Sequence, residues 1–265
     1  MYSRFLRTGA ALVAAWAGLA LGEPAELRVC ADPDNLPYSH ADGSGFENRI
    51  ARVIADELGA RLAYDWLPQI RGYVRKTLGE GRCDVFIGVP SEFERLLTTK
   101  PYYRSSYAFV SRDAGAPVRS FDDARLARLT IGVQLVGDDL AATPPGHALA
   151  ARGMVDNVRG YPVMGEGPAA QRMVQAVARG ELDVAVVWGP QAGYHASRAG
   201  KLPVALAGAP PALRGIPFEY SISMGVKRGN RALRDALDAA IERRRAEIDA
   251  ILAAYHVPRT DLPPR

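Results

Sequence analysis

The sequence predicts an α/β protein of two lobes, each a mostly parallel sheet flanked by helices, joined by two hinge crossings. Short apolar runs alternate with segments whose apolar residues recur at helical spacing, which is the order of repeated βα units. Each half of the chain also holds one apolar run bounded by turn residues, DVFIGV at 84–89 and LDVAVVW at 182–188, typical of a buried parallel strand. Proline and small residues gather at 111–118 and 207–219, where we expect the crossings.

The first predicted unit is a strand at 27–31, a long loop and a helix at 46–58. The loop is built from turn residues such as Asp32, Asn35 and Gly43. The helix carries its apolar residues on one face and ends before Gly59, a residue that favours helix ends. Loops at the carboxyl ends of parallel strands face the ligand crevice of α/β proteins, so we expect a binding site here.

The remaining elements follow the same alternation. Alternating or continuous apolar runs predict further strands at 61–67, 84–89, 106–111, 129–134, 158–163, 182–188, 202–206 and 220–226. Helical spacing, with glycine or proline at the ends, predicts helices at 72–78, 168–179, 190–199 and 230–255. The expected boundaries are lobe 1 at 23–111 and 219–256, lobe 2 with the hinge crossings at 112–218, and a Pro-rich tail at 257–265.

The amino terminus predicts export. Residues 1–22 hold Arg4 and Arg7 before an apolar stretch at 8–21 that ends in small residues, the pattern of a cleaved signal peptide. No cysteine stands at the cleavage point, so we do not expect a lipoprotein, and no later run is apolar for long enough to span a membrane. The net charge of +4 falls by 2 to +2 without the signal, too small to predict a nucleic-acid partner.

The two cysteines leave two possibilities open. In an oxidising compartment, Cys30 and Cys83 favour one disulfide. Against it, Cys30 comes late in one predicted strand and Cys83 at the start of another. If the two strands are parallel neighbours, the two cysteines would be offset by about three residues, which is roughly 10 Å along the strands. A disulfide needs the two Cα atoms within roughly 7 Å of each other. The sequence therefore does not decide between a bridge and two free thiols.

Signals for catalysis or metal binding are weak. The chain has no G-x-S-x-G, no H-E-x-x-H and no glycine-rich dinucleotide fingerprint. Its four histidines are scattered, and its paired aspartates are too short a cluster for a calcium or lanthanide loop. We therefore expect no catalytic residue, no metal site and no cofactor.

Seven segments in register resemble one known group. They are CADPDNLPYS, GFENRIA, GRCDVFIGVP, TTKPYYRSSYAFV, IGVQLVGDD, AVVWGPQAGY and RRRAEIDAIL. Broadly the chain resembles type 2 periplasmic solute-binding proteins of the branch that receives amino acids. More narrowly it is similar to the binding-protein-like "J" accessory proteins of periplasmic methanol dehydrogenase systems. The resemblance covers about residues 26 to 255 and implies a periplasmic protein of the two-lobed type 2 fold.

The resemblance also implies that the contacts for an amino acid are lost. Such receptors hold the α-carboxylate with an arginine and the ammonium group with a carboxylate. Aligned by motif, the arginine position falls on Glu92, the carboxylate position on Trp188, and a small hydroxyl position on Gly137, Asp138 and Asp139. We therefore expect no amino-acid binding.

Eight residues are candidates for lining the cleft between the lobes: Asp32, Asn35, Tyr38, Glu47, Glu92, Tyr102, Asp138 and Trp188. Tyr103 belongs to the same group of aromatic residues. For all of these aromatic residues the alternative is a place in the core, which we favour for Tyr102, whereas for Trp188 we favour the cleft because the end of its strand faces the crevice. For Asp32 and Glu47 the alternatives are turn formation and pairing with a helix dipole.

The function implied by the resemblance is a non-catalytic accessory protein, acting as a monomer. Its expected partner is a periplasmic dehydrogenase that uses pyrroloquinoline quinone (PQQ) to oxidise methanol or another alcohol, with its cytochrome c as a further candidate. The alternative is a solute receptor of an ABC transporter for an uncharged or cationic small molecule. An enzyme built on this fold is a third reading, and the calcium and lanthanide branches of the dehydrogenase group are both left open.

Overall fold

The computed structural model describes residues 25–69, 71–136, 141–163, 167–207 and 217–262. The six α-helices in this part of the chain are α1 (Phe46–Glu57), α2 (Pro144–Ala150), α3 (Ala169–Arg179), α4 (Gly189–Arg198), α5 (Arg231–Arg243) and α6 (Arg245–Ala254). A π-helical turn, η1, spans Arg75–Gly79, and a 3-10 turn, η2, spans Ala124–Arg128.

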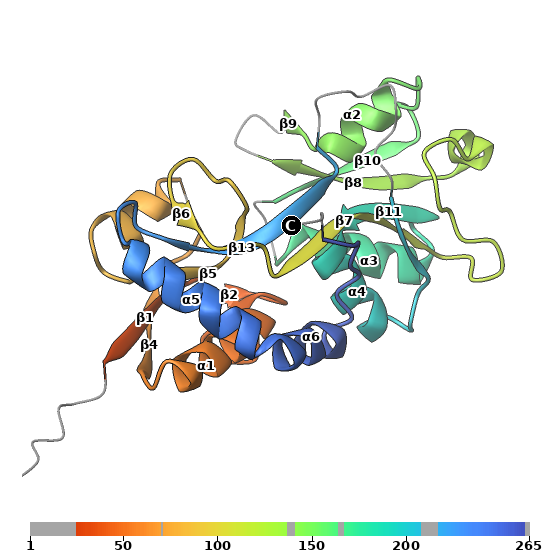
Figure 1. The fold of residues 1–265 in the computed structure, drawn as a ribbon. Coiled ribbons are helices and arrows are strands. Elements are labelled where there is room, and N and C mark those ends of the chain that lie inside the picture. The colour runs from red at the N-terminus through yellow and green to blue at the C-terminus, as the bar shows by residue number, and fades with distance from the viewer. Residues whose placement is uncertain (1–24, 70, 137–140, 164–166, 208–216, 263–265) are drawn as a thin grey trace, which may run out of the picture.

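The strands form one mixed sheet and a small hairpin (Figure 1). Along the sheet the order is β10 (Val158–Pro162), β8 (Ile131–Val136), β11 (Val184–Trp188), β7 (Tyr103–Ser111), β13 (Glu219–Val226), β5 (Val85–Pro90), β1 (Glu26–Ala31) and β4 (Arg61–Trp66). Three short strands pair beside this path, β6 (Leu97–Thr98), β9 (Ala141–Ala142) and β12 (Val204–Leu206). The hairpin joins β2 (Asp34–Asn35) to β3 (Ser39–His40).

The predicted two-lobed α/β fold is confirmed. In one lobe β1 runs parallel to β4 and β5, and in the other β8 runs parallel to β10 and β11. Two antiparallel strands join the lobes, because β13 pairs with β5 and β7, and β7 pairs with β11. Strand β7 changes partner within its length, from β13 at Ser106 to β11 at Tyr107. The lobe boundary at 111 stays a prediction, and we propose that the crossing lies inside β7.

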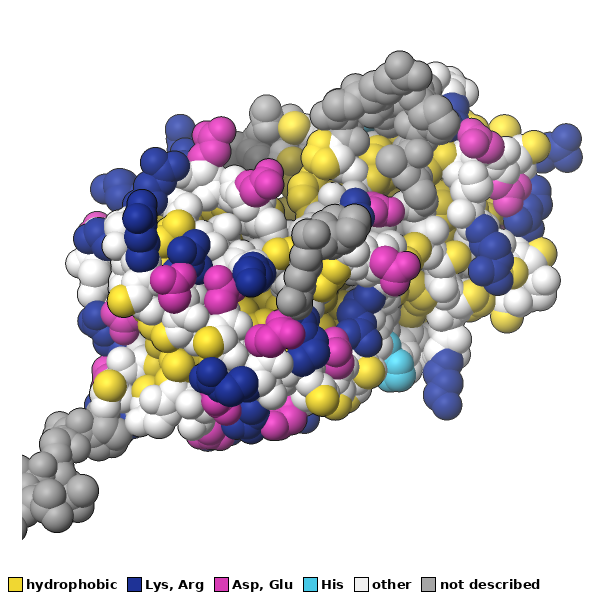
Figure 2. Space-filling view, in the orientation of Figure 1, with side chains coloured by type: hydrophobic (Ala, Val, Ile, Leu, Met, Phe, Trp, Pro, Cys, Tyr) yellow, Lys and Arg dark blue, Asp and Glu magenta, His cyan; other side chains and the backbone are white. Residues whose placement is uncertain are grey.

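Helices cover each lobe and bury separate cores. Helix α1, with α5 and α6, closes the first lobe over Phe46, Ile50 and Leu237. Helices α3 and α4 close one face of the second lobe, and an aromatic cluster of Phe109, Phe121 and Phe218 lies in its other core. On the face drawn in Figure 2, basic and acidic side chains are interspersed over α5 and α6.

Cys30 and Cys83 form a disulfide, with Cα atoms 5.3 Å apart. The expected spacing of about 10 Å is therefore wrong as a distance. The strand register was estimated correctly, since Val29 lies opposite Val85. Cys83, however, lies in the loop between η1 and β5, and this loop contacts β1, because the amide of Asp84 donates to the carbonyl of Arg28 at 2.7 Å. The loop brings both sulfur atoms into one buried apolar cluster.

Other expectations needed correction. The single helix expected at 230–255 is broken at Arg244, which pairs with Glu57 of α1 and Glu247 of α6. The helix expected at 72–78 is the π-helical turn η1, and α2 was not predicted.

The Pro-rich tail is not free as far as the structure describes it. Val257 is buried, and the carbonyl of Pro258 accepts a hydrogen bond from the Ser105 hydroxyl at 2.6 Å. The amide of Thr260 donates to the carbonyl of Arg104 at 3.0 Å. Gly193 of α4 permits this packing, since a Cβ there would lie 1.8 Å from the carbonyl oxygen of His256. The segment therefore ties α4 to β7 next to the lobe crossing.

Candidate functional site

A cavity of about 420 Å³ lies where strands from both lobes end. The first lobe contributes the carboxyl end of β5 and the loop after β1, and the second contributes Gln134 of β8 and the end of β11. The crossing strands β7 and β13 contribute Tyr107 and Tyr220. This cavity, which we call the cleft, is at the position predicted for a ligand site in an open α/β sheet.

Aromatic side chains form much of the cleft wall. Trp188, the last residue of β11, lies opposite Tyr107 in the ladder, and their rings meet edge to face at 5.6 Å. Tyr220 of β13 meets the Trp188 indole in the same way at 5.5 Å. Trp188 therefore stands between two tyrosines from the strands that join the lobes.

Tyr38 and Trp188 bring the two lobes together in the cleft. Tyr38 comes from the loop after β1, Trp188 ends β11, and both side chains line the cavity. Burial raises the pKa of Tyr38 well above its usual value, and the negative charge of Glu47 acts in the same direction. Tyr38 is thus a neutral phenol at the point where the two lobes meet.

Glu47 supplies a carboxyl group to the cleft from the first turn of α1. The helix start is held against the loop, because the Glu47 amide donates to the carbonyl of Tyr38 at 2.9 Å. Gly88 of β5 leaves room for the carboxyl, since a Cβ there would lie 2.1 Å from Oε1. Removal from water raises the pKa of Glu47 from 4.5 to about 8, so the group is protonated at neutral pH.

The other polar side chains in the described lining are uncharged. Four amide side chains reach the cleft, those of Asn35, Gln69, Gln134 and Gln191. No lysine, arginine or histidine is among the described residues that line it. The described wall therefore has no side chain that could pair with the carboxylate of an amino acid.

The eight predicted residues divide into three groups. Asn35, Tyr38, Glu47 and Trp188 line the cleft. Asp32, Glu92 and Tyr102 do not line it, and Asp138 lies outside the described residues.

The three residues that miss the cleft do so for different reasons. Tyr102 is only 1% exposed, and its hydroxyl donates to the carbonyl of Ile87 at 3.1 Å, so its ring is in the core. Its neighbour Tyr103 lines the cleft instead. Glu92 is exposed on a turn with a φ of 62°. Asp32 accepts backbone hydrogen bonds from Asp34 at 2.9 Å and Gln69 at 2.7 Å, so it orders the loops around the cleft.

Sequence reasoning missed five polar or aromatic lining residues. Gln134 had a usable signal, because it stands at the carboxyl end of an apolar strand. Tyr107 and Tyr220 had no usable signal in the sequence. Which side of the sheet their rings lie on depends on the register of β7 and β13. Gln69 and Gln191 were likewise not distinguished from ordinary surface amides.

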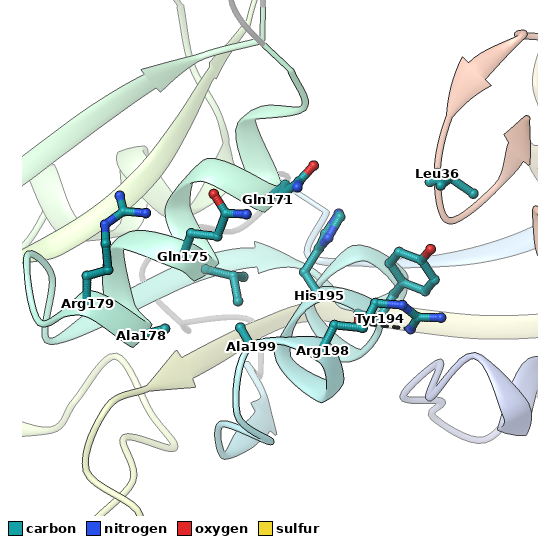
Figure 3. A pocket seen from close by; sticks show the side chains of 10 residues that line it. Leu36, Gln171, Gln175, Ala178, Arg179, Tyr194, His195, Arg198 and Ala199 are labelled. Carbon is teal, nitrogen blue, oxygen red and sulfur yellow. Dashed lines mark hydrogen bonds between the residues drawn. The ribbon is translucent and has the colours of Figure 1, made fainter.

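A second cavity of about 530 Å³ lies between α3 and α4 (Figure 3), and we call it the α3–α4 groove. Arg198 of α4 lies 3.6 Å above the ring of Tyr194. His195 is 7% exposed, and its Nε2 has no hydrogen-bond partner. Burial, followed by the nearby charge of Arg198, lowers the pKa of His195 to about 4. Arg179 also lines the groove, where it pairs with Glu181 at 2.6 Å, so two guanidinium groups border this cavity and none borders the described part of the cleft.

Within the described ranges, no group of three or more histidine, cysteine or acidic side chains is arranged to hold a metal ion. None of the described helices has the length and apolar character needed to cross a bilayer.

Comparison with known proteins agrees with this architecture. The family model of bacterial extracellular solute-binding proteins, family 3, matches residues 27–257. The protein MoxJ of Paracoccus denitrificans is 33% identical over 259 residues, which is 91% of this chain and 94% of that protein. MoxJ of Methylorubrum extorquens is 36% identical over 249 residues, 88% of this chain and 81% of that protein.

The same relationship is found among solved structures. The periplasmic binding protein XoxJ from Methylobacterium extorquens AM1 is 35% identical and superposes with a TM-score of 0.75. The match covers 89% of this chain and 100% of XoxJ. The predicted resemblance to the "J" proteins is confirmed by these relatives.

Proposed function

The chain belongs to the bacterial extracellular solute-binding proteins of family 3, and from that premise we propose a non-catalytic accessory role in the periplasm. The protein docks to a PQQ-dependent methanol or alcohol dehydrogenase and assists its maturation or activity. Support for the partner comes from the relatives named MoxJ and XoxJ, which match nearly the whole chain. Residues 1–22 act as the export signal in this proposal.

The observation that carries the proposal is the composition of the cleft wall. A receptor for amino acids needs a cation for the carboxylate, and none is present among the described lining residues. Trp188 occupies the end of β11 and lines the cleft together with Tyr38 of the other lobe. The described part of the wall is thus aromatic and, with Glu47 protonated, uncharged at neutral pH.

Such a wall suits a protein segment. Tyrosine and tryptophan are frequent anchors at protein interfaces, because each buries a large apolar area and retains one polar group. The two lobes meet along β7 and β13, so a segment that enters between Trp188 of one lobe and Tyr38 of the other would open the cleft about these strands. Docking and lobe movement are then coupled.

A solute receptor is the second candidate. Four amides and one carboxyl in a cavity of about 420 Å³ would serve an uncharged or cationic small molecule. The two candidates differ in what the cleft releases on binding. A receptor hands its solute to a membrane transporter, whereas an accessory protein contacts the dehydrogenase directly.

Analytical ultracentrifugation of residues 23–265 with the cognate apo- and holo-dehydrogenase tests the docking proposal. We expect association with at least one form, and a loss of at least tenfold in affinity for Trp188→Ala. The matched control is Trp66→Ala, because Trp66 is a partly buried indole on β4 that stacks on Tyr64 outside the cleft. Association with neither form, together with normal dehydrogenase activity in a deletion strain, contradicts the proposal.

A further inference from the structure

The cleft combines an acid with aromatic faces, and its described lining residues include no competing cation. Glu47 is the only acidic side chain among the described lining residues. Trp188, Tyr107 and Tyr220 present rings within the same cavity. Aromatic faces attract cations through their quadrupole, and an adjacent carboxylate adds a full opposite charge. Together these features form the wall of a site for a weakly hydrated organic cation.

We infer that the cleft binds an organic ammonium group, with Glu47 as its counter-ion and Trp188, Tyr107 and Tyr220 as its aromatic wall. The group has two sources with the same chemistry, a free amine or a lysine side chain on a docking protein. The inference goes beyond the docking proposal, because an ammonium site would serve an accessory protein and a solute receptor alike. Its failure would leave the dehydrogenase partner untouched.

Nothing described around Glu47 already neutralises its charge. The ionisable groups that interact with it are phenols on the loop after β1, β4, the turn before η1, and the start of β7: Tyr38, Tyr64, Tyr73, Tyr102 and Tyr103. The pKa of each phenol is raised by burial, so all five are neutral near pH 7. A bound cation would therefore be the first positive charge beside Glu47.

The helix starts at the cleft offer few free amide donors to an anionic ligand. Free amides at a helix start would favour an anion in the cleft. Here the amides of Phe46 and Glu47 donate to the loop carbonyls of Pro37 and Tyr38, at 2.8 and 2.9 Å. At the start of α4, Pro190 has no N–H to offer. Both helix starts that reach the cleft have thus lost donors that an anionic ligand would use.

Proton linkage gives the site a distinct signature. Because burial raises the pKa of Glu47 to about 8, a cation that binds at neutral pH must displace the carboxyl proton. Affinity for a permanently charged ligand then rises roughly tenfold per pH unit up to about pH 8 and levels off above it. A ligand held only by the aromatic wall shows no such slope.

The test is isothermal titration calorimetry of the mature chain with choline, whose charge does not titrate, and with its uncharged isostere 3,3-dimethyl-1-butanol. We expect choline to bind at least tenfold more tightly than the isostere at pH 8. Titration in buffers of different ionisation enthalpy at pH 6.5 should show release of about one proton. Choline binding no tighter than the isostere, or without a pH slope, overturns the inference for a free amine.

A second pair of probes separates the two sources. These are a blocked Gly-Lys-Gly peptide and the same peptide with norleucine in place of lysine. Preference for lysine with no preference for choline assigns the site to a partner's side chain, and the reverse assigns it to a free amine. If neither charged probe is preferred over its uncharged counterpart, the ammonium site is refuted whatever the dehydrogenase experiment shows.

Variants locate the site. Glu47→Gln matches the shape of the protonated carboxyl, so it should fold and should lose both the pH slope and at least tenfold in affinity for the preferred cation. Glu219→Gln is the matched control, because Glu219 is an acid of β13 that already pairs with Arg104 at 2.8 Å and does not line the cleft. Equal losses in both variants would show that the cation responds to overall charge, and would refute the assignment to Glu47.

Discussion

The cleft and the α3–α4 groove share structural elements but differ in chemistry. Asn35 lines the cleft and the next residue, Leu36, lines the groove, while α4 contributes Gln191 to one and Tyr194, His195 and Arg198 to the other. The described wall of the cleft has one acid, which is protonated at neutral pH, and no cation, whereas two arginines and a buried histidine line the groove. One helix thus serves two cavities of different electrostatic character, so position in the fold alone does not define what a cavity binds.

Each cavity keeps one ionisable group neutral at pH 7. Burial raises the pKa of Glu47 to about 8, and burial assisted by Arg198 lowers the pKa of His195 to about 4. A ligand that makes Glu47 ionise must be positive. His195 lies beside a cation, so protonation there is opposed from the start. The pH dependence of stability should therefore have opposite signs for the two side chains.

The largest expected effect concerns the support of the cleft. The disulfide joins β1 to the loop before β5, two strands whose carboxyl ends lead to the cleft, and no equivalent bridge supports the groove. In the chain-entropy model, a disulfide that closes a loop of 53 residues stabilises the folded state by about 4 kcal/mol. We expect Cys83→Ser to lose about that much free energy of unfolding in urea denaturation without reductant.

The loss should also be localised. Hydrogen exchange in Cys83→Ser is expected to rise in β1, β5 and the loop of Asp32 before it rises in α3 and α4. Dithiothreitol should bring the wild type to the level of the variant. If the variant were as stable as the oxidised wild type, or if α3 and α4 opened first, the disulfide would not support the cleft in particular.

The next effect is the pH dependence from Glu47. Between pH 4.5 and 8 the unfolded chain releases the Glu47 proton while the folded chain keeps it, so the folded state loses stability as pH rises through this window. Glu47→Gln removes that loss, so the variant should be more stable than the wild type by about 2 kcal/mol at pH 8. This figure is smaller than the whole pKa shift would give, because the carboxyl is partly in contact with water in the cleft.

Urea denaturation at pH 4, 6 and 8 checks this expectation. The difference between Glu47→Gln and the wild type should be near zero at pH 4 and should grow at each step. A difference that stays constant with pH would mean that the carboxyl ionises in the folded cleft as easily as in water.

The smallest effect comes from His195, with the opposite sign. Between pH 6.5 and 4, His195 is protonated in the unfolded chain but stays neutral in the folded chain. The folded state therefore loses stability as the pH falls through this range. When the pH is lowered from 7 to 5, the free energy of unfolding should fall by about 1 kcal/mol less in His195→Gln than in the wild type.

Thermal melts across this range measure the effect, with His147→Gln as the control because His147 is an exposed histidine of α2. The control should follow the wild type. If both variants lowered the sensitivity to acid equally, the groove would have no special role in it.

The sequence by itself determined the α/β fold and the first half of the site. Apolar periods of 2 and 3.6 follow from the local geometry of strands and helices, so the strand at 27–31, the helix from Phe46 and the exposed end of the strand at Trp188 could be predicted without tertiary information. The same reasoning predicted a binding crevice at the loop that carries Asn35 and Tyr38, and both residues line the cleft.

Only the tertiary structure decided which aromatic residues face the cleft and whether the cysteines meet. Tyr102 and Tyr103 are neighbours in sequence, yet one is core and the other lines the cavity, because the register of β7 against β13 fixes which side each presents. Cys83 bonds to Cys30 from the loop before β5 and not from a position within the strand. The space for the Glu47 carboxyl depends on Gly88, 41 positions away in the chain and adjacent only in the fold. These contacts are long-range, and no local period records them.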